Sequence, residues 1–145
     1  MSISLASSRA DTVVRLKKAG VTPTQQRVEI AQLLFAQHQH VSAEQVLAMA
    51  NAQSSVVSKA TVYNTLGLFA SKGLLREVIV DPTKVFYDSN TSDHHHFYNV
   101  DSGELMDIEG ESVQLADLPE LPAGTQAEGV DVIIRIRRAS DQTSD

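Results

Sequence analysis

Apolar residues recur at helical spacing through the first half of the chain. In residues 9–19, and in the segment that Thr24 opens, they return every three or four positions, as on the buried face of a helix. Ser42 and Gln45 have the spacing of a capping box and predict the start of a third helix. A fourth helix is predicted over residues 58–72, because a serine precedes its apolar stripe and a glycine follows it.

The second half of the chain changes to the pattern of strands. Residues 74–80 and 85–87 are rich in β-branched and aromatic residues and flank a turn sequence, which predicts a β-hairpin. Residues 109–129 are interrupted by proline and glycine and predict irregular structure. In residues 130–137 apolar side chains alternate, so we expect a strand with one apolar face. The remaining strands are expected over residues 94–100 and 104–108.

The order of these elements predicts an α+β fold. Three or four short helices followed by a hairpin is the arrangement of a winged helix-turn-helix domain, in which one helix enters the major groove of DNA. The hairpin is then the wing, and residues 58–72 form the recognition helix. A plain helical bundle whose last helix lies on the surface has the same order and spacing, so the pattern alone leaves both open.

The composition narrows the chemistry. The chain has 145 residues, enough for one compact domain or two small ones. It contains no cysteine, so a disulfide or a thiolate zinc site is excluded and any metal must have nitrogen and oxygen ligands. The N-terminus lacks the apolar core of a signal peptide, and no apolar run is long enough to span a membrane. We therefore expect a cytoplasmic protein without a membrane partner.

The net charge of −6 is unevenly distributed. Residues 1–80 contain 8 basic and 4 acidic residues, a balance of +4, whereas residues 81–145 contain 4 and 14, a balance of −10. A basic half favours contact with phosphate, because neutralising DNA releases counterions. A chance gradient over a solvated surface is the alternative. If the first half binds DNA, the recognition helix would present Lys59, Thr61, Tyr63, Asn64 and Thr65, and further phosphate contacts would come from Arg15, Lys17, Lys18 and Arg27.

The run around His94, His95 and His96 is the most informative segment. On a strand, His94 and His96 point to one face and His95 to the other, so two imidazoles form half of a metal site. Carboxylates at Asp88 and Asp107 would complete a set that suits Fe, Mn or Zn. The three histidines are also candidate axial ligands for haem. A weakly structured surface tract and the remnant of a purification tag are the competing interpretations. The sequence lacks hydrolase and nucleotide-binding motifs, and we expect no enzymatic activity.

Three segments together resemble the ferric uptake regulator (Fur) family: HVSAEQVLAMA, SKATVYNTLGLFASKGLLREV and KVFYDSNTSDHHHF. The resemblance extends from about Gly20 to Arg137. It implies a homodimer with a winged helix, a small C-terminal α/β dimerisation domain and an inter-domain metal site that controls DNA binding. Carried over by position, the resemblance implies that the metal ligands are His40, Asp88, His94, His96 and Asp107.

The chain also departs from the family pattern. Many members hold a structural zinc ion with the four cysteines of two C-x-x-C pairs; here Asn99 and Ser102 stand at the first pair, so no such zinc site is expected. Gln114 replaces the glutamate of an accessory site, and Thr22 replaces a basic residue that reaches the minor groove. The absent cysteines and the HHH run resemble the iron response regulator branch, which implies haem as effector.

The sequence therefore predicts a repressor that controls iron and haem homeostasis genes. Its cofactor would be haem, Fe(II) or Mn(II), and its partners would be a second copy and an AT-rich palindromic operator, with a haem-delivering enzyme as a further candidate. The alternatives are a peroxide-sensing repressor that depends on Fe or Mn, and a manganese- or iron-responsive Fur-type repressor. The expected boundaries are residues 1–87 for the DNA-binding domain, 88–93 for a hinge, 94–139 for the sensing domain and 140–145 for a disordered tail.

Overall fold

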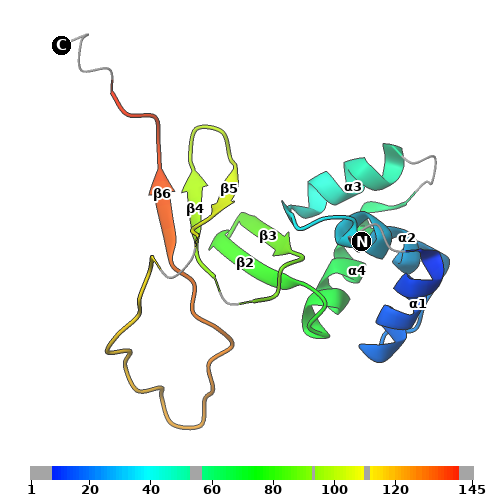
Figure 1. Cartoon of the computed structure of the whole chain (residues 1–145), viewed down its shortest axis with the longest axis horizontal. Coiled ribbons are helices and arrows are strands. Elements are labelled where there is room, and N and C mark those ends of the chain that lie inside the picture. Colours follow the sequence, from blue (N-terminus) through cyan, green and yellow to red (C-terminus); the bar gives the residue numbers. More distant parts are fainter. Residues whose placement is uncertain (1–7, 53–56, 93, 110–111, 141–145) are drawn as a thin grey trace, which may run out of the picture. The chain divides into compact units, whose positions relative to one another are not determined.

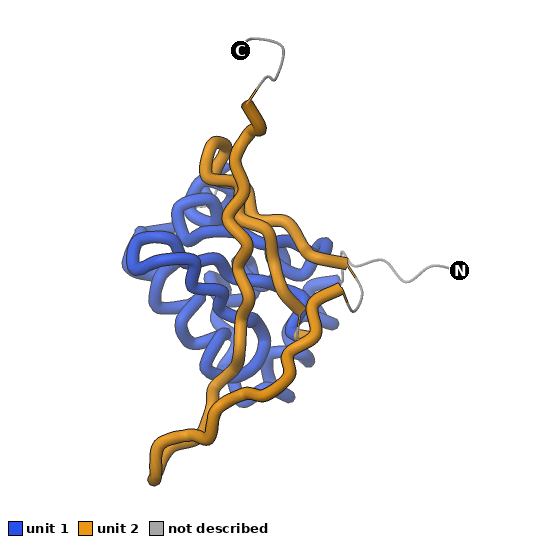
Figure 2. The backbone as a smooth tube through the Cα atoms, turned by 90° about the vertical axis from the view of Figure 1, so that its left-hand side faces the viewer, with its two compact units in different colours: residues 1–91 blue, residues 92–145 orange. Residues whose placement is uncertain are grey.

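The computed structural model describes residues 8–52, 57–92, 94–109 and 112–140. The chain divides into two compact units, residues 1–91 and residues 92–145, which Figure 2 shows in different colours. Helices and strands are both present, which confirms the predicted α+β class. The predicted tail falls mainly on residues 141–145, which lie outside the described residues.

Four helices form most of the first unit (Figure 1): α1 (Arg9–Lys18), α2 (Gln25–Phe35), α3 (Ala43–Ala52) and α4 (Lys59–Ser71). The predicted caps are confirmed. Thr24 accepts a hydrogen bond from the backbone of Arg27, and Ser58 accepts one from Thr61. Ser42 and Gln45 exchange side-chain and backbone hydrogen bonds of 2.8 and 3.2 Å, a complete capping box.

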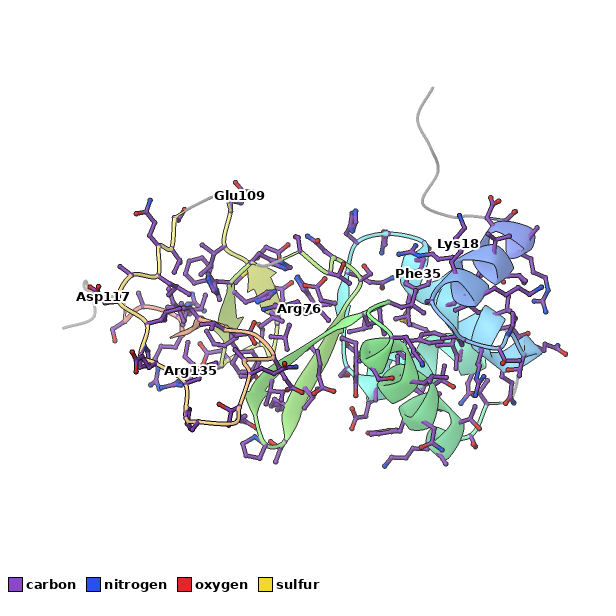
Figure 3. The ribbon with its side chains drawn as sticks, turned by 90° about the horizontal axis from the view of Figure 1, so that it is seen from below. Lys18, Phe35, Arg76, Glu109, Asp117 and Arg135 are labelled. Atoms are coloured by element: carbon purple, nitrogen blue, oxygen red, sulfur yellow. The ribbon has the colours of Figure 1, made fainter. Side chains whose placement is uncertain are left out.

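The helices bury one continuous core. Its largest fully buried side chain is Phe69 of α4, whose ring stacks on Phe35 of α2 with 6.5 Å between centroids. Figure 3 labels Phe35 at the end of its helix. The guanidinium of Arg15 covers the other ring of this pair, 3.8 Å above the centroid of Phe35. Gly73 follows α4 with a φ of +77°, a conformation that glycine adopts without a Cβ clash, so the chain turns here into the sheet.

The wing is a three-stranded sheet rather than a simple hairpin. β2 (Arg76–Asp81) and β3 (Lys84–Asp88) form the predicted hairpin, and β1 (His40–Val41) pairs with the other edge of β3. β1 is not predictable from the sequence, because two residues are too few to show an alternating pattern. Its register places His40 directly opposite Asp88.

The second unit contains a separate three-stranded sheet in the order β5-β4-β6. β4 (His96–Asn99) pairs antiparallel with β5 (Leu105–Asp107) and parallel with β6 (Ile133–Ile136). Strands are the regular elements of its described part. Residues 112–129 have no helix or strand and form the long irregular excursion of Figure 1, as predicted, while residues 110–111 lie outside the described residues.

These strands are shorter than the sequence patterns suggested. His94 and His95 precede β4 rather than belonging to it, and residues 130–132 precede β6. The apolar face expected for β6 is not buried in the single chain, because Ile134 is 41% exposed while its neighbour Ile133 is half-buried. β6 is an edge strand of the described sheet and pairs with β4 on one side.

The β4–β5 turn contains Asn99 and Ser102. The side-chain oxygen of Asn99 accepts hydrogen bonds from the backbones of Asp101 and Ser102, at 2.9 and 3.1 Å. The carboxylate of Asp101 accepts one from Arg138, which ties the turn to the chain after β6. An Asx turn and its hydrogen bonds therefore hold the β4–β5 turn. In the described part of the chain, no helix has the length and apolarity needed to cross a membrane.

Candidate metal centre and nucleic-acid interface

A first pair of candidate ligands lies at the edge of the wing. Because β1 and β3 are paired in register, Nε2 of His40 lies 3.6 Å from Oδ2 of Asp88. Asp88 is 1% exposed, and it also accepts a hydrogen bond from the backbone of Asn90 at 2.8 Å. One imidazole and one carboxylate are thus fixed to the sheet of the first unit.

A second group of candidate ligands lies within the other unit. The β4–β5 register places His96 opposite Asp107, with 3.3 Å between Nε2 and Oδ1. Nε2 of His94 approaches the same carboxylate oxygen at 3.1 Å, and the two imidazole centroids are 4.5 Å apart. The donor atoms of these three residues lie within 4.8 Å of one another. The predicted grouping of His94 and His96 is observed, although His94 reaches it from the residues before the strand.

The tautomer of His94 can be derived from its neighbours. Its Nδ1 lies 2.7 Å from the backbone oxygen of Ser92, and a carbonyl oxygen can only accept. Nδ1 therefore carries the hydrogen, and the neutral ring directs the lone pair of Nε2 toward the carboxylate of Asp107. Two electron pairs at 3.1 Å repel each other unless a cation lies between them or the ring is protonated. This is the arrangement of a metal-ligating histidine whose other nitrogen is held by a backbone carbonyl.

His95 has the opposite arrangement. Its Nδ1 accepts a hydrogen bond of 2.9 Å from the backbone of Val132, so in the neutral ring the hydrogen is on Nε2. Nε2 then has no lone pair to offer. The adjacent backbone is held too, because the N–H of His96 donates to the oxygen of Val132. His95 therefore links the residue before β4 to the residue before β6. This structural role could not be predicted from the HHH run.

The exposed face of α4 carries most of the predicted DNA-contacting side chains. Lys59, Tyr63 and Asn64 are exposed and Thr61 is half-buried. Thr65 is a correction, because only 5% of its surface is exposed and it packs toward the helix core. The apolar positions at i, i+4 and i+7 suggested a stripe too narrow to include Thr65, whereas the buried side of α4 spans neighbouring positions as well.

Tyr63 is held by Glu44, a residue that no sequence motif singled out. Its hydroxyl donates to Oε2 of Glu44 on α3 at 3.0 Å, and the ammonium of Lys59 lies 5.6 Å from the ring centroid. Donation to the carboxylate raises the pKa of Tyr63. A backbone hydrogen bond in the first turn of α3 and the Tyr63 hydroxyl lower the pKa of Glu44, so its charge is retained. The sequence contains no pattern that predicts this contact between Glu44 and Tyr63, which are 19 positions apart.

The four basic residues predicted to face phosphate behave differently from one another. Lys17 and Lys18 are exposed at the end of α1, where Figure 3 labels Lys18. Arg15 is exposed but lies over Phe35, and burial lowers the pKa of its guanidinium. Arg27 is half-buried and donates to the backbone oxygen of Thr22 at 2.9 Å, so it shapes the loop before α2.

A winged-helix unit followed by a strand unit with clustered histidines and carboxylates is the organisation of metal-dependent transcription regulators. Residues 18–130 match the model of the Ferric uptake regulator family, and the chain belongs to that family. It is 30% identical over 98 residues to the peroxide-responsive repressor PerR of Staphylococcus epidermidis. The aligned part is 68% of this chain and 65% of that protein, just under two thirds of its length.

Solved structures agree with this assignment. The ferric uptake regulator of Pseudomonas aeruginosa with manganese is 25% identical and has a TM-score of 0.64, over 88% of this chain and 97% of that one. The Vibrio cholerae ferric uptake regulator shares the fold, with 22% identity and a TM-score of 0.68 over 88% and 100% of the two chains. The matched proteins are named as regulators and repressors, and these names agree with the expectation of a regulator rather than an enzyme.

Proposed function

We propose that this chain is a dimeric repressor that binds operator DNA through α4 and responds to one divalent metal ion held jointly by its two units. The first unit would supply His40 and Asp88, and the second would supply His94, His96 and Asp107. The observation that carries the proposal is the approach of two imidazole nitrogens, Nε2 of His94 and Nε2 of His96, to the same carboxylate oxygen of Asp107, at 3.1 and 3.3 Å. Such a contact is stabilised by a cation.

The donor set suits Fe(II) or Mn(II). Three imidazoles and two carboxylates would form a nitrogen and oxygen site, which favours these borderline and hard ions over copper(I). Each unit alone offers only two or three donors, fewer than such ions prefer. An ion shared by both units favours the arrangement in which all five ligands meet, and it thereby shifts the population of postures available to the DNA-binding unit.

The geometry of the three histidines favours a bare metal ion over haem as the effector. His96 is fully buried, and His95 uses Nδ1 for the backbone of Val132, so two of the three haem candidates are engaged in the fold. Haem binding at the HHH run, and with it a haem-delivering partner, stays a prediction. Peroxide sensing remains the second candidate, because the relative from Staphylococcus epidermidis is named as peroxide-responsive.

A single titration series tests the proposal. The metal-free protein is mixed with a duplex selected from random-sequence DNA, and binding is measured by fluorescence anisotropy with Mn(II), Fe(II) under argon, or haemin. We expect Mn(II) and Fe(II) to change the affinity for DNA at stoichiometric occupancy, and haemin to leave it unaltered. If haemin changes the affinity for DNA while Mn(II) and Fe(II) leave it unaltered, the metal proposal is wrong and the haem prediction is correct.

The second copy has a surface available in the second unit. Six apolar side chains of the second unit are at least 40% exposed, and all but one of them lie between β5 and β6 or on β6 itself. They are Val100, Leu115, Leu118, Leu121, Val130 and Ile134. A twofold dimer buries such a surface and presents two α4 helices, which predicts a palindromic operator with half-sites about one helical turn apart, or a multiple of it.

Replacing Tyr63 by alanine should weaken binding to the selected operator by about 1–3 kcal/mol, the usual value of a side chain that reads a base pair. Tyr63→Phe should cost less, because the hydroxyl is already engaged by Glu44 and the ring would make the contact. Anisotropy measured with operator and scrambled duplexes separates reading of the bases from attraction to phosphate. Undiminished operator binding by Tyr63→Ala would contradict the proposal that α4 lies in the major groove.

A further inference from the structure

Two hydrogen-bonded residues connect the first ligand pair to the helices. Gln39 and Ser89 directly adjoin the candidate ligands His40 and Asp88 in the sequence. The backbone of Ser89 donates to the oxygen of Gln39 at 3.1 Å, and the backbone of Gln39 donates to the hydroxyl of Ser89 at 3.0 Å. That hydroxyl donates in turn to the oxygen of Gln37 at 3.2 Å. We call Gln39 and Ser89 the latch.

The latch ends on a helix of the DNA-binding unit. The side-chain amide of Gln39 donates to the oxygens of Leu33 and Leu34, at 2.9 and 3.0 Å. These are two of the last four carbonyls of α2, which have no partner inside the helix. α2 is the central helix of the unit, because it contacts α1, α3 and α4. Gln39 therefore joins the start of β1 to the end of α2 by direct hydrogen bonds.

We propose that Gln39 and Ser89 are positioning residues that couple metal occupancy to the DNA-binding helices. The proposal rests on the metal site of the preceding section. The ion would fix His40 and Asp88, the latch would hold their backbone neighbours against the C-terminus of α2, and α2 would carry that constraint to α4. Neither latch side chain is a ligand, so its role lies in transmission and not in affinity for metal.

The test compares coupling with affinity. For each variant, the affinity for the selected duplex is measured without and with saturating Mn(II), and the ratio of the two dissociation constants is the coupling factor. The affinity for Mn(II) without DNA is measured separately, from the electron paramagnetic resonance of the free ion. We expect Ser89→Ala and Gln39→Ala to lower the coupling factor about three- to ten-fold, the usual effect of a residue along a coupling network. Their affinities for Mn(II) and their DNA binding without metal should change little.

Three further variants sharpen the experiment. Gln37→Ala is the matched control, because its side chain is exposed and only its backbone oxygen meets the latch. Ser89→Thr retains the hydroxyl and should restore coupling. The double variant Gln39→Ala/Ser89→Ala should be no worse than either single variant, because residues that act as one unit are not additive.

The outcomes separate this proposal from the one on which it rests. If the wild type binds DNA equally with and without metal, the proposed function fails and the latch proposal fails with it. If the wild type is coupled and both latch variants keep its coupling factor, only the latch proposal is wrong. A variant that loses metal affinity to the same extent as coupling, or that no longer melts cooperatively, makes the pair part of the ligand cage or of the fold, and this also overturns the proposal.

Discussion

Replacing His94 by alanine should abolish the metal response of DNA binding. The variant loses an imidazole whose Nδ1 is held by the backbone oxygen of Ser92 and whose Nε2 lies 3.1 Å from Oδ1 of Asp107. Changing an outer-shell partner of a metal ligand costs about 10- to 100-fold in affinity, so removing the ligand itself should cost at least about 100-fold. Mn(II) concentrations that saturate the wild type would then leave the operator affinity of the variant at its metal-free value.

The neighbouring histidine provides a matched control. His95→Ala removes the same ring from the same run, and both side chains are half-buried. Because His95 only accepts a hydrogen bond from Val132, its loss should leave metal affinity nearly unchanged. It should instead leave a half-buried N–H unsatisfied and destabilise the second unit by about 1–3 kcal/mol. Equal loss of Mn(II) affinity in the two variants would show that the tautomers do not decide ligation.

This contrast shows what the sequence could and could not predict. Alternation along a strand predicted that His94 and His96 share a face, and their ring centroids are 4.5 Å apart even though His94 lies before the strand. Their role as metal ligands stays a prediction. It could not show that the residues before β4 are irregular, or that Val132, 37 positions away, would engage His95. A residue's tautomer is set by partners that only the folded chain brings near.

The same distinction applies to the helical unit. The capping box at Ser42 and the caps at Thr24 and Ser58 are local, because each joins residues three positions apart, and all were predictable. The pairing of β1 with β3 was not, because His40 and Asp88 are far apart in the sequence and β1 is only two residues long. For His40, the ligand role came from the family resemblance alone, and the strand register now explains how it meets a carboxylate.

The latch could not be predicted from the sequence for a related reason. Gln39 and Ser89 are ordinary polar residues beside a helix end and a strand end, and their types carry no chemistry of their own. Their significance lies in geometry, since Gln39 satisfies carbonyls of α2 while Ser89 satisfies Gln39. Glu44 is a similar case, because its task depends on the approach of Tyr63 from the next helix.

Replacing Phe69 by alanine should have the largest effect on stability. The ring is fully buried and stacks on Phe35, so truncation removes apolar contacts from both α2 and α4 and leaves a cavity between them. Such a change costs about 3–5 kcal/mol. A whole domain is stable by only about 5–15 kcal/mol, so a large part of the variant's margin would be lost. Urea unfolding followed by circular dichroism at the helical band measures this in the first unit, because all the described helices belong to it.

Two variants of the same helix give the scale for that measurement. Leu68→Ala truncates a half-buried side chain and should cost clearly less than Phe69→Ala, whereas Tyr63→Ala truncates an exposed ring and should stay within about 0.5 kcal/mol of the wild type. Equal losses for Leu68 and Phe69 would contradict a core centred on the aromatic pair. The ordering also separates the two tasks of α4: Tyr63→Ala should lose operator binding at unchanged stability, and Phe69→Ala should lose DNA binding only to the extent that the helical unit unfolds. The side chains proposed for recognition and those that pack in the core therefore lie on different faces of α4, and the packing face determines whether the helix is folded.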